Sequence, residues 1–220
     1  AVQKDIDIRT GGPTLIDFDM QRISQRINII LNIRTEGDIK KEDLLPPIIE
    51  LSGACGHFNI SEACLDTTRL YRMVHQAQPD EFTQTGENTY RCVVHFHTLG
   101  VIPSAAKGHL NGPGILQVAL QVSANRLDAS GAPVLDQDGK PVKNSRYIYG
   151  AINPYDELTA AQLIEVRDGK TYLRYSKDDV NIEITSPLVI KADQIVSDDT
   201  GMGWQPNDPT NPDDDIIIEI

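Results

Sequence analysis

Residues 89–122 read TYRCVVHFHTLGVIPSAAKGHLNGPGILQVALQV, and this stretch decides the fold. Its two arms alternate apolar and other positions, so each arm can bury one face of a strand. The positions expected to be buried are Tyr90, Cys92, Val94 and Phe96 in the first arm, and Leu116, Val118, Leu120 and Val122 in the second. Glycine and proline crowd residues 108–114, where neither arm can continue. The pattern predicts two long strands of one sheet, joined by a connection longer than a hairpin.

Elsewhere the chain also favours strands. Residues 15–34 fit either a helical stripe or an alternating strand, and their many isoleucines favour the strand because β-branched residues pack well on a pleated sheet. Residues 48–51 are predicted to form a short strand that ends at Ser52-Gly53, and residues 69–74 a weaker one. One short helix is predicted over residues 156–166, with acidic residues in its first turn. Because helix is scarce and strands recur at short spacing, the fold class is an all-β sandwich.

The length and a change of character suggest the domain organisation. A chain of 220 residues forms one large β-domain or two compact ones. After Asn125, turn sequences rich in Asp and Gly interrupt the strands. We therefore predict an N-terminal β-sandwich domain over residues 1–124. Residues 125–220 are predicted to form a smaller C-terminal β domain with an acidic linker and a terminal strand.

Charge and hydropathy exclude several classes of partner. The formal net charge of −12 argues against nucleic acid, whose phosphates require clustered Lys and Arg, and against an anionic membrane surface. No apolar run approaches the roughly 20 residues of a membrane span. We expect no nucleic-acid partner and no direct membrane span.

The sequence shows no signature of an enzyme. His95 and His97 share one strand face and have the geometry of a partial metal site, but two half-exposed histidines are the simpler interpretation. Asp136 and Asp138 favour a β-turn over a calcium loop. No residue is therefore predicted to be catalytic, to bind a cofactor or to bind a metal. Cys92 is predicted to be a core residue, whereas a disulfide between Cys55 and Cys64 stays open.

The last segment carries the candidate functional residues. Residues 195–220 contain seven acidic residues and no Lys or Arg, and they end in the apolar run IIIEI. An apolar strand behind such a tether must pair with a sheet, because otherwise it promotes aggregation. Trp204 lies between glycine and polar residues, and is either a buried anchor or a possible ligand contact that stacks on a sugar.

The order of these features resembles the fimbrillin family, the pilus and pilus-like surface lipoproteins of Bacteroidales. The segments that carry the resemblance are FDMQRISQRINIILNIRTEG (residues 18–37), IIELSGACGHFNI (48–60), VVHFHTLGVIP (93–103), ILQVALQV (115–122), YLRYSKDDVNIEI (172–184) and GMGWQP (201–206). The resemblance requires residues 20–34 to form a strand and the two arms of residues 90–122 to pair side by side.

The resemblance implies one or two transthyretin- or immunoglobulin-like β-sandwich domains with Greek-key-type connections. It also implies export as a lipoprotein to the cell surface or outer membrane, with a possible lipid anchor upstream of Ala1. The implied function is a non-enzymatic fimbrial subunit or adhesin-like accessory protein, which binds other fimbrial subunits or cell-surface proteins by β-strand addition. Ile216, Ile218 and Ile220 are the strand-donation candidates, although they equally suit a strand that closes the molecule's own sheet. The alternative function is a surface or periplasmic module that binds a glycan or peptide near Trp204.

Overall fold

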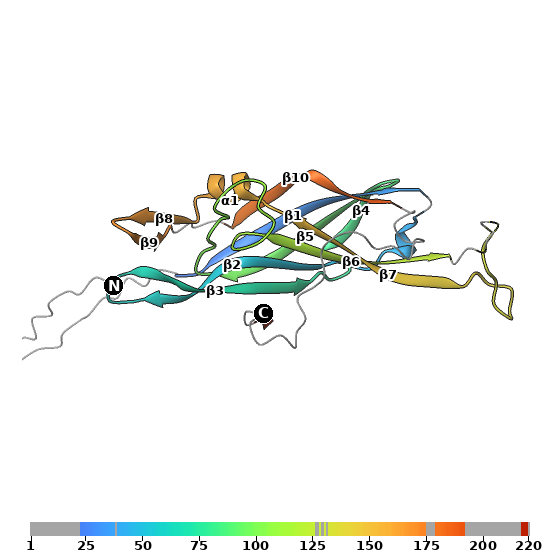
Figure 1. Ribbon diagram of the computed structural model, residues 1–220, viewed down its shortest axis with the longest axis horizontal. Coiled ribbons are helices and arrows are strands. Elements are labelled where there is room, and N and C mark those ends of the chain that lie inside the picture. Colours follow the sequence, from blue (N-terminus) through green and yellow to red (C-terminus); the bar gives the residue numbers. More distant parts are fainter. Residues whose placement is uncertain are drawn as a thin grey trace, which may run out of the picture.

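The protein is a β-sandwich in which two sheets pack face to face (Figure 1). A computed structural model describes residues 23–37, 39–125, 128, 130, 132–174, 179–191 and 217–219. The smaller sheet has the strand order β10-β1-β5-β4, and the larger has the order β7-β6-β2-β3-β9-β8, with β11 beside β3. The predicted all-β sandwich fold is confirmed.

The smaller sheet is built around β1 (Gln25–Glu36), the isoleucine-rich strand. Its inward positions Ile27, Ile29, Leu31 and Ile33 are at most 1% exposed, so the strand prediction is confirmed for residues 25–34. On one side β1 pairs antiparallel with β5 (Thr89–Thr98), which in turn pairs with β4 (Phe82–Gly86). On the other side it pairs in parallel with β10 (Val180–Lys191).

The larger sheet contains the remaining strands. They are β2 (Ile48–Asn59), β3 (Cys64–Gln76), β6 (Leu116–Asn125), β7 (Lys143–Ile152), β8 (Ile164–Arg167), β9 (Lys170–Leu173) and β11 (Ile217–Glu219). A 3₁₀ turn, η1 (Lys41–Asp43), precedes β2. The predicted helix is present as α1 (Tyr155–Ala161), but it ends five residues earlier than predicted. Gln162 adopts a left-handed conformation with φ of 49°, and the chain then enters β8.

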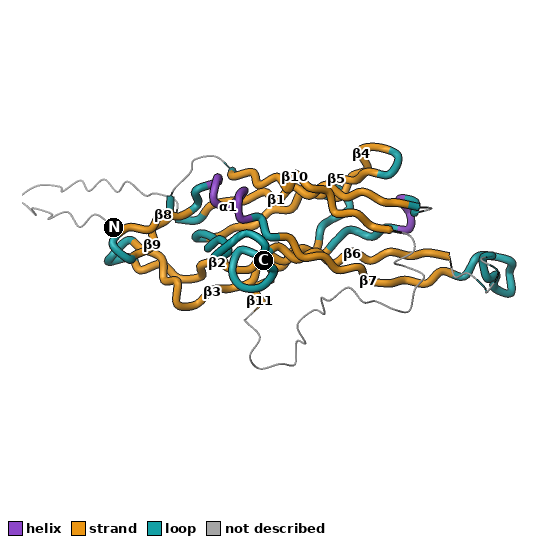
Figure 2. Tube along the Cα trace, turned by 45° about the horizontal axis from the view of Figure 1, so that its top comes forward, coloured by secondary structure: helices purple, strands orange, loops and turns teal. Residues whose placement is uncertain are grey.

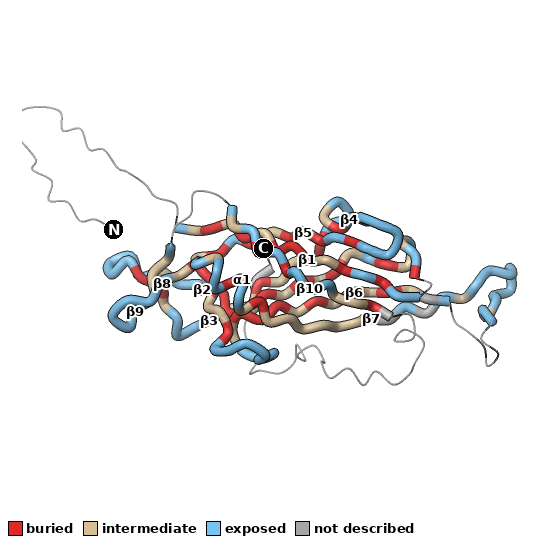
Figure 3. The backbone as a smooth tube through the Cα atoms, turned by 90° about the horizontal axis from the view of Figure 1, so that it is seen from above, coloured by how far each residue is buried: buried red, intermediate tan, exposed pale blue. Residues whose placement is uncertain are grey.

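The core fills the space between the two sheets, where buried residues concentrate (Figure 3). The inward positions of both arms are buried as predicted, and Cys92 lies among them at 0% exposure. Side chains from β2, β3 and β10 complete the core, including Leu51, Met73 and Ile182.

The prediction that the two arms of residues 89–122 pair in one sheet is wrong. The first arm is β5 in the smaller sheet, and the second is β6 in the larger sheet, where it pairs with β2 and β7. The connection between them binds β2 at an irregularity in that strand. The amide of Cys55 donates to the carbonyl of Gly100 at 2.8 Å, and the amide of Ile102 donates to the carbonyl of Gly53 at 2.9 Å. The chain therefore passes from one sheet to the other through this connection.

Strands on the two sides of the predicted domain boundary lie side by side. β7 pairs with β6 from Leu116↔Ile152 to Asn125↔Lys143, and β10 pairs with β1. Leu158 and Leu163, which follow the boundary, belong to the same hydrophobic core as the N-terminal strands. Residues before and after position 124 thus share both sheets and one core.

Candidate functional site

The edge of β3 that faces away from β2 is incompletely paired. Near its start, β3 pairs with β9 only through Leu65↔Thr171. Near its end it pairs in parallel with β11, through Arg72↔Ile217, Met73↔Ile218 and Val74↔Glu219 (Figure 2). No strand among the described residues pairs with this edge at residues 66–71. Because an unpaired edge presents backbone N–H and C=O groups, it is a template for another strand.

The short β11 includes one of the three strand-donation candidates. Ile218 lies opposite Met73 of the same chain. Ile216, Ile220 and Trp204 lie outside the described residues. In this structure the terminal strand therefore adds to the molecule's own larger sheet. It does so through three residues in a parallel ladder, a pairing slightly less stable per residue than an antiparallel one.

A shallow hollow of about 350 Å³ lies at the turn that joins β2 to β3. The hollow is lined by His57, Phe58, Asn59, Glu62, Cys64, Leu65 and Asp66. The antiparallel register explains this composition, since it sets His57 opposite Asp66 and Asn59 opposite Cys64. The carboxamide oxygen of Asn59 accepts hydrogen bonds from the amides of Ser61 and Glu62, which closes the turn.

The charged groups of the hollow are engaged with their neighbours. Lys170 of β9 lies 3.0 Å from Glu62, and its hydrogen bond lowers the pKa of that carboxyl. The hydroxyl and amide of Thr68 donate to Asp66 and hold its pKa below the usual range. Both carboxylates are therefore ionised and partnered at neutral pH.

The thiols are poorly suited to nucleophilic chemistry. Burial and the neighbouring Glu62 carboxylate raise the pKa of the Cys64 thiol. Burial raises the pKa of Cys55 to about 11. Because the thiolate is the nucleophile, protonated thiols at neutral pH do not supply one. His57 Nδ1 lies 3.3 Å from the hydroxyl of Tyr71, so this imidazole has a tyrosine rather than a thiol as its partner.

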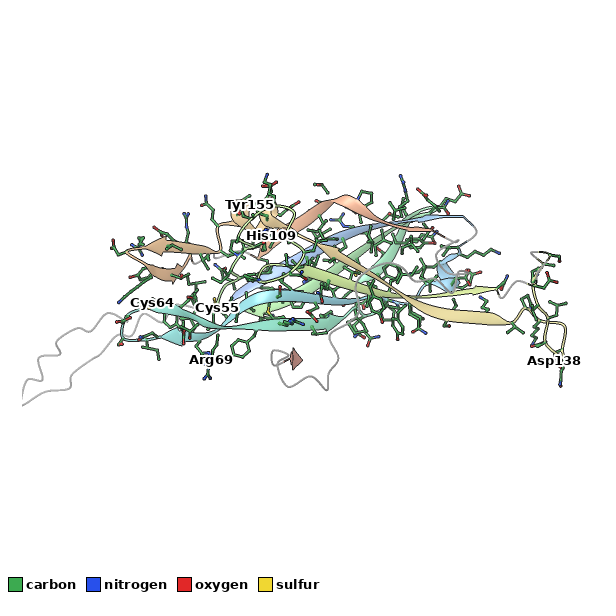
Figure 4. The ribbon with its side chains drawn as sticks, viewed as in Figure 1. Cys55, Cys64, Arg69, His109, Asp138 and Tyr155 are labelled. Atoms are coloured by element: carbon green, nitrogen blue, oxygen red, sulfur yellow. The ribbon has the colours of Figure 1, made fainter. Side chains whose placement is uncertain are left out.

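The register of β2 and β3 shows whether Cys55 and Cys64 can form a disulfide. All three cysteines are free. Cys64 lies opposite Asn59, four residues along β2 from Cys55, which corresponds to roughly 13 Å of strand. A disulfide requires Cα atoms within about 7 Å. The two residues accordingly occupy separate positions along the hairpin (Figure 4).

The histidines considered for a metal are separated from other ligands. His95 Nδ1 lies 2.7 Å from the carboxamide oxygen of Asn28 on β1, and His97 is exposed. In the part of the chain that the structure describes, no three His, Cys, Asp or Glu side chains are grouped to hold a metal ion. Asp136 instead caps a turn, because its carboxylate accepts hydrogen bonds from the amides of Asp138 and Lys140.

The fold and the β3 edge define an all-β sandwich protein with an exposed site for backbone pairing. Comparison with family models, with curated proteins and with solved structures found no match to this chain. Among the described residues, none of the helices is both long and apolar enough to cross a membrane.

The sequence predicted the terminal apolar strand, but it predicted only part of β3, the strand with which it pairs. Only residues 69–74 of β3 were predicted as a weak strand, because the exposed Thr67 and Thr68 break the alternation before them. The hollow was missed as well. Its one sequence signal was the pattern Asn59-Ile-Ser61, which is typical of a side-chain-capped turn.

Proposed function

We propose that this protein is a non-enzymatic cell-surface structural protein, a fimbrial subunit or an adhesin-like accessory, that joins its partners by β-strand addition at the β3 edge. The observation that carries the proposal is the mismatch in length between β3 and β11. Among the described residues, only three residues of β11 and a single β9 pair lie along this side of the 13-residue β3.

Strand addition follows from the physical chemistry of this edge. A donated strand that extended along residues 66–76 would form more ladder hydrogen bonds than β11 forms now. The terminal strand is connected to β10 by the long segment at residues 192–216, so the same residues have the reach to pair with a second copy. Exchange of an identical strand between copies conserves the contacts already made.

The family resemblance does not support this proposal, because one of its two requirements fails. Its first requirement, a strand over residues 20–34, is met for residues 25–34, which lie in β1. Its second requirement is not met, because β5 and β6 lie in opposite sheets. The proposal therefore depends on the β3 edge. Export as a lipoprotein to the cell surface is part of the same proposal. Trp204, on which the alternative of a glycan- or peptide-binding module depended, lies outside the described residues, so that alternative stays a prediction.

Removal of the terminal strand tests the proposal. A chain that lacks residues 216–220 is expected to keep its fold by circular dichroism and to lose the self-association of the full chain in light scattering. A peptide with the sequence DDDIIIEI should bind this truncated chain, whereas a scrambled peptide of the same composition should not. Unchanged self-association, together with reduced stability, would show that the strand serves only its own molecule.

A further inference from the structure

The β5–β6 connection, residues 99–115, contains a chemically labile pair, Asn111-Gly112. This is the only place in the sequence where glycine follows asparagine. Both residues are exposed, and they lie outside the helices and strands. Because glycine has no side chain, its backbone nitrogen is open to close approach by the carboxamide of the preceding residue. The pair therefore has the composition and the exposure that favour ring closure between neighbouring residues.

The surroundings of the pair leave both reacting groups available. No atom lies within 4 Å of the position that a Cβ of Gly112 would occupy. Among the described residues, none accepts a hydrogen bond from the Gly112 amide, and none bonds to the Asn111 carboxamide. By contrast, the carboxamide oxygen of Asn59 accepts hydrogen bonds from the amides of Ser61 and Glu62. The Asn111 side chain is thus free to turn toward the next backbone nitrogen.

We propose that Asn111 deamidates spontaneously through a cyclic imide (succinimide) formed with Gly112, and that the isoaspartate product loosens the attachment of the β5–β6 connection to β2. The Gly112 nitrogen attacks Cγ of Asn111, so an N–Cγ bond forms. The bond from Cγ to Nδ2 breaks, and Nδ2 leaves as ammonia with the proton of the Gly112 amide.

Water then opens the ring in one of two ways. Addition of water at Cγ breaks the bond from Cγ to the Gly112 nitrogen and gives aspartate. Addition at the backbone carbonyl carbon of Asn111 breaks its bond to the same nitrogen and gives isoaspartate, in which the main chain runs through Cβ and Cγ. The reaction consumes only water, so it does not depend on strand addition at the β3 edge.

The pair lies between two attachments of the connection. Before it, the carboxamide nitrogen of Asn153 donates to the carbonyl of His109 at 2.8 Å. After it, the hydroxyl of Ser52 in β2 donates to the carbonyl of Gly112 at 2.8 Å, and the amide of Gly114 donates to the carbonyl of Ser52 at 3.0 Å. A change in the length of the main chain at the pair therefore falls on a short segment that is held at both ends.

The end of the connection has little room to absorb such a change. A Cβ atom on Gly114 would lie 2.6 Å from the amide nitrogen of Ser104 and 2.7 Å from Cα of Pro103, so the backbone here is packed against the start of the connection. Isoaspartate lengthens the main chain by one atom. The added atom should displace Gly112 and weaken its hydrogen bond with Ser52.

Incubation of the full chain at mildly alkaline pH tests the reaction. Mass spectrometry of its peptides should locate at Asn111 the mass gain of OH in place of NH2, and an isoaspartyl methyltransferase should label the product. The rate should be close to that of a free peptide of residues 106–116. Asn59 is the internal control and should stay intact, because the β-branched Ile60 hinders ring closure. Asn111→Gln is the matched control, since it keeps a carboxamide but would need a larger ring.

Hydrogen exchange of the Gly114 amide tests the effect on the connection. In the separated isoaspartate form this amide should exchange about fivefold faster than in fresh protein, the factor that corresponds to the loss of one hydrogen bond. Asn111→Asp carries the added charge without the extra main-chain atom, and its Gly114 amide should exchange like that of fresh protein.

Four results would overturn the proposal. Retention of Asn111 in the folded chain, whether or not the free peptide converts, would exclude the reaction, and an equal mass gain in Asn111→Gln would place it elsewhere. Unchanged exchange of Gly114 in the isoaspartate form would separate the reaction from the attachment to β2. Equally fast exchange in Asn111→Asp would assign the effect to charge instead of chain length.

Discussion

A Cβ atom on Gly53 would lie 2.6 Å from the amide nitrogen of Gly114 and 2.7 Å from the carbonyl oxygen of Ile102. The amide of Gly114 also donates to the carbonyl of Ser52 at 3.0 Å. The backbone of β2 is thus in direct contact with both ends of the connection from β5 to β6. This contact is where the chain crosses between the sheets.

Gly53→Ala is expected to destabilise the protein by at least about 2 kcal/mol, because the residue has φ of +85° and its new methyl group would meet backbone atoms. Urea unfolding measures the loss. Gly139→Ala is the matched control, since Gly139 has φ of +75° with no atom within 4 Å of the added Cβ. It should cost only about 1 kcal/mol, the cost of the backbone conformation alone. Equal losses in the two variants would mean that the close approach has no energetic consequence.

The described strands should unfold as one cooperative unit. Ile182 in β10 is 1% exposed and packs in the core shared with β1 and β5. Ile182→Ala should lower the free energy of unfolding by about 3 kcal/mol. Circular dichroism and labelling of Cys92 in β5 should report the same urea midpoint in this variant. Two separate transitions, with Cys92 still protected after the first, would instead indicate that residues 125–220 form an independent domain.

The contact between His75 and Glu81 should make stability depend on pH. Burial opposes ionisation of Glu81, but hydrogen bonds from the Gln78 amide and from His75, whose Nε2 lies 2.8 Å away, leave its pKa below the ordinary value. A carboxyl with a lowered pKa stabilises the fold fully above its unfolded pKa, and this contribution disappears as the pH falls through the lowered folded value.

Glu81→Gln should therefore cost about 1 kcal/mol near neutral pH and almost nothing in acid below the ordinary glutamate range. Urea unfolding at a series of pH values checks this convergence. Glu36→Gln serves as the control, because the Arg34–Glu36 pair is half exposed and should contribute little at any pH. A constant difference between the wild type and Glu81→Gln across the pH range would contradict the ionic contribution.

The three cysteines should remain reduced and slow to react in the folded protein. Burial raises the pKa of Cys92 to about 12 and that of Cys55 to about 11, so neither forms much thiolate at pH 8. Iodoacetamide should label them only after unfolding, as mass spectrometry of the native and denatured protein can show. Detection of a Cys55–Cys64 disulfide in the native protein would contradict the observed register of β2 and β3.

The predicted elements succeeded where the signal was local. Alternation located β1, β5 and β6 and identified their buried faces, because the two-residue period of a strand is visible in neighbouring residues. The same reasoning stopped β2 at Ser52-Gly53, although the strand continues to Asn59. The glycine there marks an irregularity within the strand, and only the bound connection from Gly100 to Ile102 reveals that it is not an end.

For the candidate site too, the sequence predicted the local element but not its partner. The apolar terminal run had to pair with some sheet, but its pairing with Arg72–Val74 depends on contacts between segments far apart in the chain.

By itself, the sequence determined that this protein is an all-β sandwich and which face of each long strand is buried, since burial follows from the spacing of apolar side chains along the chain. Only the tertiary structure decided which strands are neighbours, and with them the β3 edge. The physical reason is that backbone hydrogen bonds between strands are nearly the same for any sequence. The choice among possible partners therefore depends on long-range packing and on the close approach at Gly53.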